Sequence, residues 1–220
     1  MHIFENVQEV LKKIATVEES CGRKTTVVGV TKSVDTKAAR ELVKSGIVNI
    51  AENRTELFLD KYNKMSNLDV TWHLIGTLQR RKVKEVINLV DYFHALDSVK
   101  LAQEIDKRAK HVIKCFLQVN VSGEASKHGF SPNDLDQVLA EIADLSHIQI
   151  VGLMTMAPIN ATDAELDSIF AKASALQRQI AAQNLTHSPC TELSMGMSRD
   201  YQRAIQHGAT FVRIGSEFFK

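Results

Sequence analysis

One lysine in this sequence is placed where it could do covalent chemistry. Lys32 directly follows residues 25–31, a nearly continuous Thr/Val run broken only by Gly29, and such a run is typical of a strand buried on both faces. A partly desolvated lysine amine at the end of such a strand can form a Schiff base with an aldehyde. Considered alone, Lys32 is more simply an ordinary solvated lysine, so its interpretation depends on its surroundings.

Two segments near the carboxyl terminus could bind a phosphate. They are Ser194-Met195-Gly196-Met197-Ser198 and Gly215-Ser216, and Arg213 lies just before the second. Their small residues leave backbone N–H groups accessible, and Ser198 precedes a predicted helix whose amino terminus would favour an anion. Glycine and serine are also ordinary turn and cap residues, and either segment alone fits that simpler role.

The elements that position these residues alternate between strands and helices. Apolar residues at helical spacing predict an amphipathic helix over residues 3–20, ahead of the first strand. Asp35 or Thr36 can cap the helix after Lys32, and Gly46 ends it. Apolar and β-branched runs predict eight strands with a helix between successive strands, over residues 25–32, 47–51, 70–76, 92–96, 111–121, 148–156, 191–195 and 210–214.

Eight strand–helix repeats predict an α/β fold in the form of a closed (β/α)₈ TIM barrel. We expect a single domain over residues 1–220, in which residues 1–20 pack on the barrel as an extra N-terminal helix. A doubly wound open sheet is the competing architecture, but it needs a glycine-rich turn where this chain has Thr31-Lys32-Ser33-Val34. In a barrel the strand ends meet at one mouth, where we expect Lys32, Asn53, His73, Gly76, Asp97, Asn120, residues 154–156, residues 194–198 and residues 213–216.

This arrangement suits pyridoxal 5′-phosphate (PLP). The loops after strands seven and eight of a barrel commonly bind phosphate, and the two small-residue segments fall there. The PLP aldehyde would then lie at Lys32 and its phosphate at these loops. If Arg213 donates a hydrogen bond to the pyridine nitrogen, that nitrogen stays unprotonated, because arginine keeps its own protons. The cofactor would be a poor electron sink, which favours holding it, or mild carbanion chemistry, over transamination.

Seven blocks in this order resemble the pyridoxal phosphate homeostasis proteins, which are single-domain relatives of the alanine racemase barrel. The resemblance covers almost the whole chain, and the Leu-Ser-Met-Gly-Met-Ser and Arg-Ile-Gly motifs are specific. The blocks are Val30-Thr31-Lys32, Ala51-Glu52-Asn53-Arg54, Trp72-His73-Leu74-Ile75-Gly76, Gln118-Val119-Asn120, Gly152-Leu153-Met154-Thr155, Leu193-Ser194-Met195-Gly196-Met197-Ser198 and Val212-Arg213-Ile214-Gly215.

The resemblance implies a role for each site residue. Lys32 would form the internal aldimine with PLP, Arg213 would face the pyridine nitrogen and Asn53 would lie near the ring. The phosphate would be held by Ser198 with the backbone at Met197, Gly215 and Ser216. Family members often have His and Asn where this chain has Thr77 and Arg81, so a second anion contact in that loop is not expected to carry over.

The resemblance also implies a function in intracellular PLP (vitamin B6) homeostasis, as a cytoplasmic, monomeric carrier or regulator without a robust catalytic reaction. Its partners would be PLP and apo forms of PLP-dependent enzymes. The alternative is a PLP-dependent amino-acid racemase of low activity, which needs a second acid/base that alanine racemases draw from another domain and a partner subunit. We expect no such domain here, because the chain ends four residues after Ser216. A Schiff-base aldolase without a cofactor is a third class.

Four further groups have simpler interpretations. The basic group Arg80, Arg81, Lys82 and Lys84 is expected to be a solvated helix face, and His73 a hydrogen-bonded core histidine. The methionines at 154, 156, 195 and 197 are expected to pack around the mouth. Lys127 lies in a polar loop near the mouth, where a role in receiving or releasing the cofactor is a hypothesis.

The bulk composition agrees with a cytoplasmic protein that binds neither nucleic acid nor membrane. The 220 residues include 27 Lys and Arg against 26 Asp and Glu, so the formal net charge is only +1, which is too small to attract a polyanion. No apolar run is long enough to span a bilayer, and the first residues lack the apolar core of a signal peptide. The three cysteines form no CxxC pair, which favours free thiols in a reducing compartment.

Overall fold

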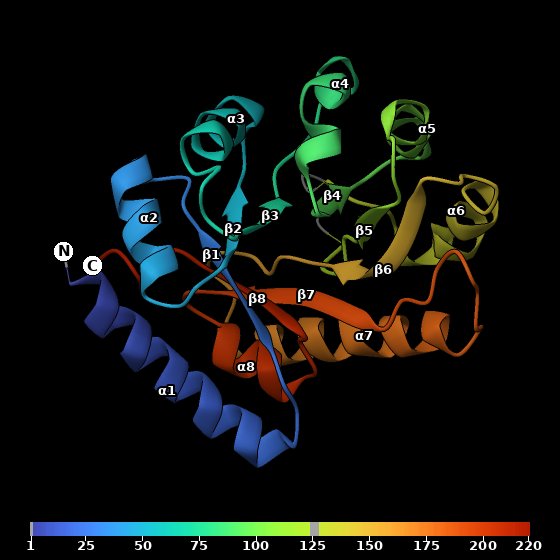
Figure 1. Cartoon of the computed structure of the whole chain (residues 1–220). Helices are drawn as coiled ribbons and strands as arrows, with labels where there is room; N and C mark the ends of the chain where they lie inside the picture. The colour runs from blue at the N-terminus through green and yellow to red at the C-terminus, as the bar shows by residue number, and fades with distance from the viewer. Residues whose placement is uncertain (1, 124–127) are drawn as a thin grey trace.

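The computed structural model describes residues 2–123 and 128–220, and its eight parallel strands close into a barrel with helices outside (Figure 1). The strands pair in sequence order and β1 also pairs with β8, so the open-sheet alternative is excluded and the predicted TIM barrel is confirmed. The strands are β1 Thr26–Val30, β2 Asn49–Glu52, β3 Thr71–Leu74, β4 Tyr92–Leu96, β5 Ile113–Gln118, β6 Ile148–Met154, β7 Glu192–Met197 and β8 Phe211–Ile214.

The helices follow the predicted order, with one exception after β3. Their bounds are α1 Ile3–Cys21, α2 Thr36–Lys44, α3 Thr55–Lys64, α4 Val83–Val86, α5 Val99–Arg108, α6 Leu135–Glu141, α7 Asp163–Ala181 and α8 Tyr201–Gln206. The Asp35 side chain caps α2 by accepting from the Ala38 N–H, as one of the two predicted caps. The exception is that α4 is a single turn between the 3₁₀ segments η1 Arg80–Lys82 and η2 Ile87–Leu89, where the sequence predicted one longer helix. A third 3₁₀ segment, η3 Pro132–Asp134, precedes α6.

The N-terminal helix α1 packs on the outside of the barrel as predicted. It buries one apolar stripe, which includes Val7, Val10 and Ile14, and its neighbours are α8 and α2 (Figure 1). The Asn6 amide donates to the Phe218 carbonyl (3.1 Å), so the two chain termini lie close together. Among the described residues, no helix is both long and apolar enough to cross a membrane.

The barrel interior is unusually polar. TIM barrels generally fill this space with Val, Ile and Leu. Here the fully buried polar side chains include His73, His94 and Ser194, and Arg213 is almost as well buried. Because polar groups buried without partners cost free energy, this composition predicts a connected hydrogen-bond network inside the barrel.

Candidate functional site

Lys32 lies two residues beyond the end of β1 and is exposed. The sequence suggested that the Lys32 amine is partly desolvated, and its exposure in the structure differs from that prediction. The residue before it, Thr31, is fully buried, and its backbone N–H donates to the Ala51 carbonyl (3.0 Å) on neighbouring β2. The backbone that positions Lys32 is therefore fixed, while its amine is open to solvent and to an incoming ligand.

A buried ion pair fixes the end of β1 from behind. Lys61, on α3, donates through Nζ to Glu52 Oε1 (2.5 Å) and to the Thr31 carbonyl (2.7 Å). The Thr31 hydroxyl also donates to Glu52 Oε1 (2.6 Å). Glu52 and Lys61 are at most 3% exposed, so the carboxylate and ammonium are both removed from water and depend on each other. The network ties β1, β2 and α3 together one residue before Lys32.

Asn53 follows β2, the strand beside β1, and its Oδ1 is buried without a hydrogen-bond partner among the described residues. Its backbone needs a glycine opposite, because a Cβ on Gly76 would lie 2.0 Å from the Asn53 carbonyl oxygen. An orphaned amide oxygen is a destabilising feature in a finished core and an ordinary one in a ligand site awaiting a donor. The structure thus places an unsatisfied acceptor next to the strand that precedes Lys32.

The two small-residue loops are joined at the end of β8. The Gly215 N–H donates to Ser198 Oγ (3.1 Å), and a Cβ on Gly215 would lie 3.0 Å from the Val30 carbonyl of β1. Ser216, next along the chain, is exposed. Ser198, Gly215 and Ser216 are thus brought to the same edge of the barrel as the end of β1.

The loop after β7 differs from the prediction in two respects. Strand β7 continues through Gly196 and Met197, because Gly196 adopts a positive φ of 92° that lets the pairing with β8 resume at Met197. Helix α8 therefore begins only at Tyr201, so Ser198 does not stand directly before a helix. The Met197 N–H, predicted to face a phosphate, donates instead to Asp200 Oδ1 (2.6 Å). Burial raises the pKa of Asp200, although this hydrogen bond and the Arg213 charge oppose the shift.

Arg213 is held by neutral groups in the barrel interior. Its Nη1 donates to Ser194 Oγ (2.5 Å) and its Nη2 to the Thr155 carbonyl (3.1 Å). Burial lowers the pKa of the guanidinium to about 10, and the Asp200 charge acts in the opposite direction. Arg213 therefore remains a cation at neutral pH, with its orientation fixed by two hydrogen bonds.

Arg213 is also one end of a chain of side chains that crosses the barrel. Ser194 Oγ lies 2.9 Å from His94 Nδ1, His94 Nε2 lies 2.9 Å from His73 Nδ1, and His73 Nε2 lies 3.0 Å from Asn49 Oδ1. His94 stacks on Phe116 and His73 on Tyr92, which fixes the planes of both imidazoles. His73 is thus the hydrogen-bonded core residue that the sequence indicated, and it does not lie at the mouth.

In this structure the direction of the chain follows from the groups at its two ends. Burial lowers the pKa of His73 to about 3 and holds the pKa of His94 well below its usual value, so both imidazoles are neutral. Arginine can only donate, and the Asn49 Oδ1 can only accept. Each imidazole must then bear its hydrogen on Nε2, and Ser194 must donate to His94 Nδ1. Every donor points from Arg213 toward Asn49.

The remaining predicted groups lie apart from this arrangement. Arg80, Arg81 and Lys84 are exposed and Lys82 pairs with Glu56, so the basic group is the predicted solvated face. Met154 and Met195 are fully buried, whereas Met156 and Met197 are 41% and 36% exposed. Asp97 directly follows the last residue of β4, as predicted, and Ser98 next to it caps α5. Lys127 lies outside the described residues. Within the described ranges no cluster of His, Cys, Asp or Glu could hold a metal ion.

Residues 6–220 match the alanine racemase N-terminal domain family. A pyridoxal phosphate homeostasis protein of Aquifex aeolicus is 35% identical over all of this chain and 98% of its own length, and one of Pseudomonas aeruginosa is 33% identical over 99% and 94%. The chain belongs to the pyridoxal phosphate homeostasis protein family. PipY of Synechococcus elongatus, a structure solved with and without PLP bound, superposes with a TM-score of 0.85 at 32% identity, covering 95% of this chain and 99% of PipY.

Alanine racemases share the fold of this family member at greater distance. The enzyme from Corynebacterium glutamicum superposes with a TM-score of 0.72 at 16% identity, over 99% of this chain and 60% of the racemase. This likeness supports the predicted barrel. At that identity it bears on the fold alone.

Proposed function

We propose that this protein binds PLP at the carboxyl end of the barrel and acts in cytoplasmic PLP homeostasis, as a monomeric carrier that gives the cofactor to apo forms of PLP-dependent enzymes. The observation that supports this most directly is the PLP-bound structure of PipY, which shares 32% identity with nearly the whole chain. The position of Lys32 beyond β1, beside the joined Ser198 and Gly215 of the last two loops, supports the same site.

The residues present fit the cofactor. Asn53 Oδ1 is a buried acceptor without a partner, which a donor on the ligand or an ordered water would satisfy. Gly215 has no side chain where the backbone of β1 approaches, and its N–H already donates to Ser198 Oγ, so the Ser198 hydroxyl hydrogen and the Ser216 N–H are the donors that can face an anion. Arg213 supplies a fixed cationic donor that an aromatic ring nitrogen can accept.

Each residue then has a distinct task. Lys32 would hold the PLP aldehyde as a Schiff base through its amine. The Ser198 hydroxyl and the Ser216 N–H would donate to the phosphate, and Gly215 would position Ser198 through its own N–H. Arg213 donates to the pyridine nitrogen and keeps its own proton, because its pKa of about 10 lies well above neutral pH. When bound, PLP supplies an electrophilic carbon and a ring that withdraws electrons, weakly so when an arginine faces its nitrogen.

This electronic setting supports a carrier more than a racemase. A two-base racemase needs an acid/base on each face of the cofactor and a ring that stabilises a carbanion. An arginine that donates to the ring nitrogen leaves that nitrogen unprotonated, so the ring stabilises a carbanion less well. We therefore propose that turnover of amino acids is at most slow, and a racemisation assay over a panel of L-amino acids checks this directly.

The carrier role is tested by transfer to an apoenzyme in the presence of a phosphatase that destroys free PLP. The PLP-loaded protein is mixed with an apo PLP-dependent enzyme, and recovery of that enzyme's activity is followed. We expect recovery to persist with phosphatase present, because the cofactor passes within a complex. Recovery that the phosphatase abolishes, as it does when free PLP is supplied, would contradict transfer by contact. Light scattering of the PLP-loaded protein alone gives its molar mass and so tests the proposal that it is a monomer.

A further inference from the structure

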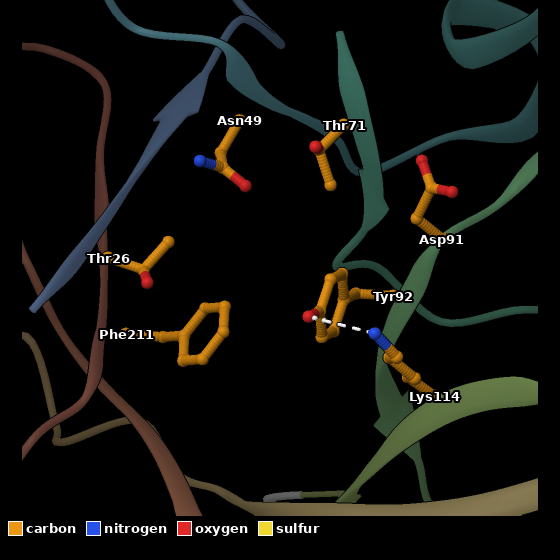
Figure 2. Close-up of a pocket in the computed structure, with 7 residues that line it drawn as sticks. All are labelled: Thr26, Asn49, Thr71, Asp91, Tyr92, Lys114 and Phe211. Atoms are coloured by element: carbon orange, nitrogen blue, oxygen red, sulfur yellow. Dashed lines mark hydrogen bonds between the residues drawn. The ribbon is translucent and has the colours of Figure 1, made fainter.

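A cavity of about 350 Å³ opens at the amino-terminal end of the barrel, opposite the proposed PLP site. Figure 2 shows the residues around it, which come from the first positions of five strands and from the start of β5: Thr26, Asn49, Thr71, Tyr92, Phe211 and Lys114. The volume is within the range of small-molecule sites. TIM barrels normally fill the interior at this end with branched aliphatic side chains. The polar lining of this cavity therefore indicates a role other than packing.

The lining includes several hydrogen-bond donors. The Lys114 ammonium lies 5.1 Å from the centre of the Tyr92 ring and 3.5 Å from its hydroxyl oxygen (Figure 2). Because Lys114 donates to that oxygen, the Tyr92 hydroxyl hydrogen is left to donate to a ligand. Thr26 and Thr71 add two hydroxyls that can do the same.

The one carboxylate at the cavity is already engaged. Asp91 Oδ2 accepts from the Trp72 backbone N–H (2.7 Å), and Figure 2 shows the carboxylate directed away from the Lys114 amine. Asp91 therefore does not neutralise Lys114 by contact. The cavity therefore presents one cation and several neutral donors, together with a hydrogen-bonded carboxylate that is directed away from the cation.

Asn49 connects the cavity to the chain of side chains that ends at Arg213. Its Oδ1 accepts from His73 Nε2, so its NH₂ group is a further donor at the cavity. If the Asn49 amide turned over, its NH₂ would donate to His73 and its oxygen would face the cavity. Both imidazoles would then have to shift their hydrogens to Nδ1, and Ser194 would no longer donate to His94. The chain thus has two discrete arrangements, and an occupant of the cavity selects between them.

We propose that this cavity is a binding site for a small oxyanion, a carboxylate or a phosphate, held by the Lys114 ammonium and by the donors of Tyr92 and Asn49. An anion stabilises the arrangement in which the Asn49 NH₂ faces the cavity and every donor of the chain points away from Arg213. The site is therefore coupled, through His73 and His94, to the Ser194 hydroxyl that orients the Arg213 guanidinium. Binding itself does not depend on the proposed PLP function.

The binding test uses the full-length protein without added PLP and follows backbone amide signals by NMR at constant ionic strength. Sodium acetate is one titrant, inorganic phosphate the second, and acetamide the uncharged control of the same shape as acetate. Saturable shifts of residues around the cavity with acetate identify a carboxylate site, and with phosphate a phosphate site. The proposal is overturned if neither anion saturates, or if acetamide binds as well as acetate.

Two variants locate the site. Lys114→Met removes the cation at an exposed position, and we expect the anion to bind about tenfold or more weakly, the effect of losing one charge-assisted hydrogen bond. Tyr92→Phe removes only the hydroxyl and should weaken binding to a smaller extent. Lys12→Met, an exposed lysine on α1, is the matched control and should change nothing. Equal affinity in the Lys114 and Lys12 variants would overturn the proposal while leaving the PLP site untouched.

The coupling between the cavity and the side chains that lead to Arg213 is measured separately. Nitrogen-15 shifts of the imidazoles distinguish a protonated ring nitrogen from a bare one. With the anion saturating, His73 and His94 should both show the hydrogen on Nε2. A shift of either hydrogen to Nδ1 on anion binding would refute the coupling.

Discussion

Arg213 illustrates how a single residue depends on groups far from it in the chain. It is 4% exposed, and among the described residues its contacts are with a hydroxyl and a carbonyl, with no carboxylate in salt-bridge range. A buried cation held by neutral partners keeps its place only if those partners are themselves fixed. Ser194 is fixed by His94, which is in turn fixed by His73. The orientation of the guanidinium is therefore set by residues of β3, β4 and β7.

Ser194→Ala tests this dependence. The substitution leaves an Arg213 N–H and the His94 Nδ1 buried without their partner, so we expect the free energy of unfolding to fall by about 1–3 kcal/mol in urea denaturation. Ser188→Ala is the matched control, because the Ser188 hydroxyl is equally buried and has no partner to lose. Its stability should be unchanged or slightly raised. Equal losses in the two variants would show that the chain through Ser194 is not stabilising.

Elements were predicted well from the sequence where local patterns determine them. Strand β4 has the predicted bounds and α2 begins and ends as expected, because a short aromatic and apolar run and an Asp cap act locally. The sequence predicts that β7 ends before Gly196, because glycine weakens a strand, whereas the positive φ of Gly196 lets the pairing continue to Met197. The broken helix around α4 was missed as well, because the basic side chains of its first turn gave no periodic signal.

No pattern in the sequence predicts how α3 is attached to the barrel. Glu52 and Lys61 are nine positions apart on different elements, and nothing in their spacing marks them as a pair. In the structure they meet at the Thr31 carbonyl and hold the end of β1. The element that positions Lys32 is thus stabilised from outside the barrel.

Lys61→Met tests that attachment. Removing the ammonium leaves the Glu52 carboxylate buried and unpaired, so we expect a loss of about 3–5 kcal/mol in the free energy of unfolding. The double variant Lys61→Met, Glu52→Gln removes both charges and should recover a substantial part of that loss. Lys64→Met, which breaks an exposed pair with Asp60 on the same helix, is the control and should lose less than about 1 kcal/mol. A double variant as unstable as Lys61→Met would contradict the interpretation.

At the scale of the whole molecule, the sequence predicts the mouth at the carboxyl ends of the barrel strands. It does not predict the connected polar chain inside the barrel. The strand ends converge as any TIM barrel requires, so Lys32, Asn53, Ser198 and Gly215 could be placed together before the structure was known. The interior chain depends on which side chains face inward from strands up to 100 residues apart. The only signal for it was a histidine within each of two apolar strands, at 73 and 94.

The polar interior makes the stability of the molecule depend on pH. An unfolded histidine gains a proton as the pH falls through about 6.5, whereas folded His73 does so only near 3. The unfolded state therefore binds more protons across this window, and stability should fall by about 1.4 kcal/mol per pH unit for each such histidine as the pH is lowered. Urea denaturation between pH 6.5 and 4.5 measures the slope.

Two variants assign that slope. In His73→Gln the slope should be smaller, because a titrating group has been removed from the interior. His111→Gln removes an exposed histidine and should leave the slope as in the wild type. The same slope in all three proteins would show that the buried histidines do not control the acid stability.

The central claim is that Lys32 is the residue that holds PLP, and trapping the bond measures it most directly. The purified protein is incubated with PLP, reduced with borohydride, digested and analysed by mass spectrometry. We predict one phosphopyridoxyl adduct on the peptide that contains Lys32, loss of that adduct in Lys32→Ala, and its retention in Lys37→Ala, an exposed lysine on the adjoining helix. A protein that stays colourless with PLP, or an adduct on another lysine that persists in Lys32→Ala, would contradict the account.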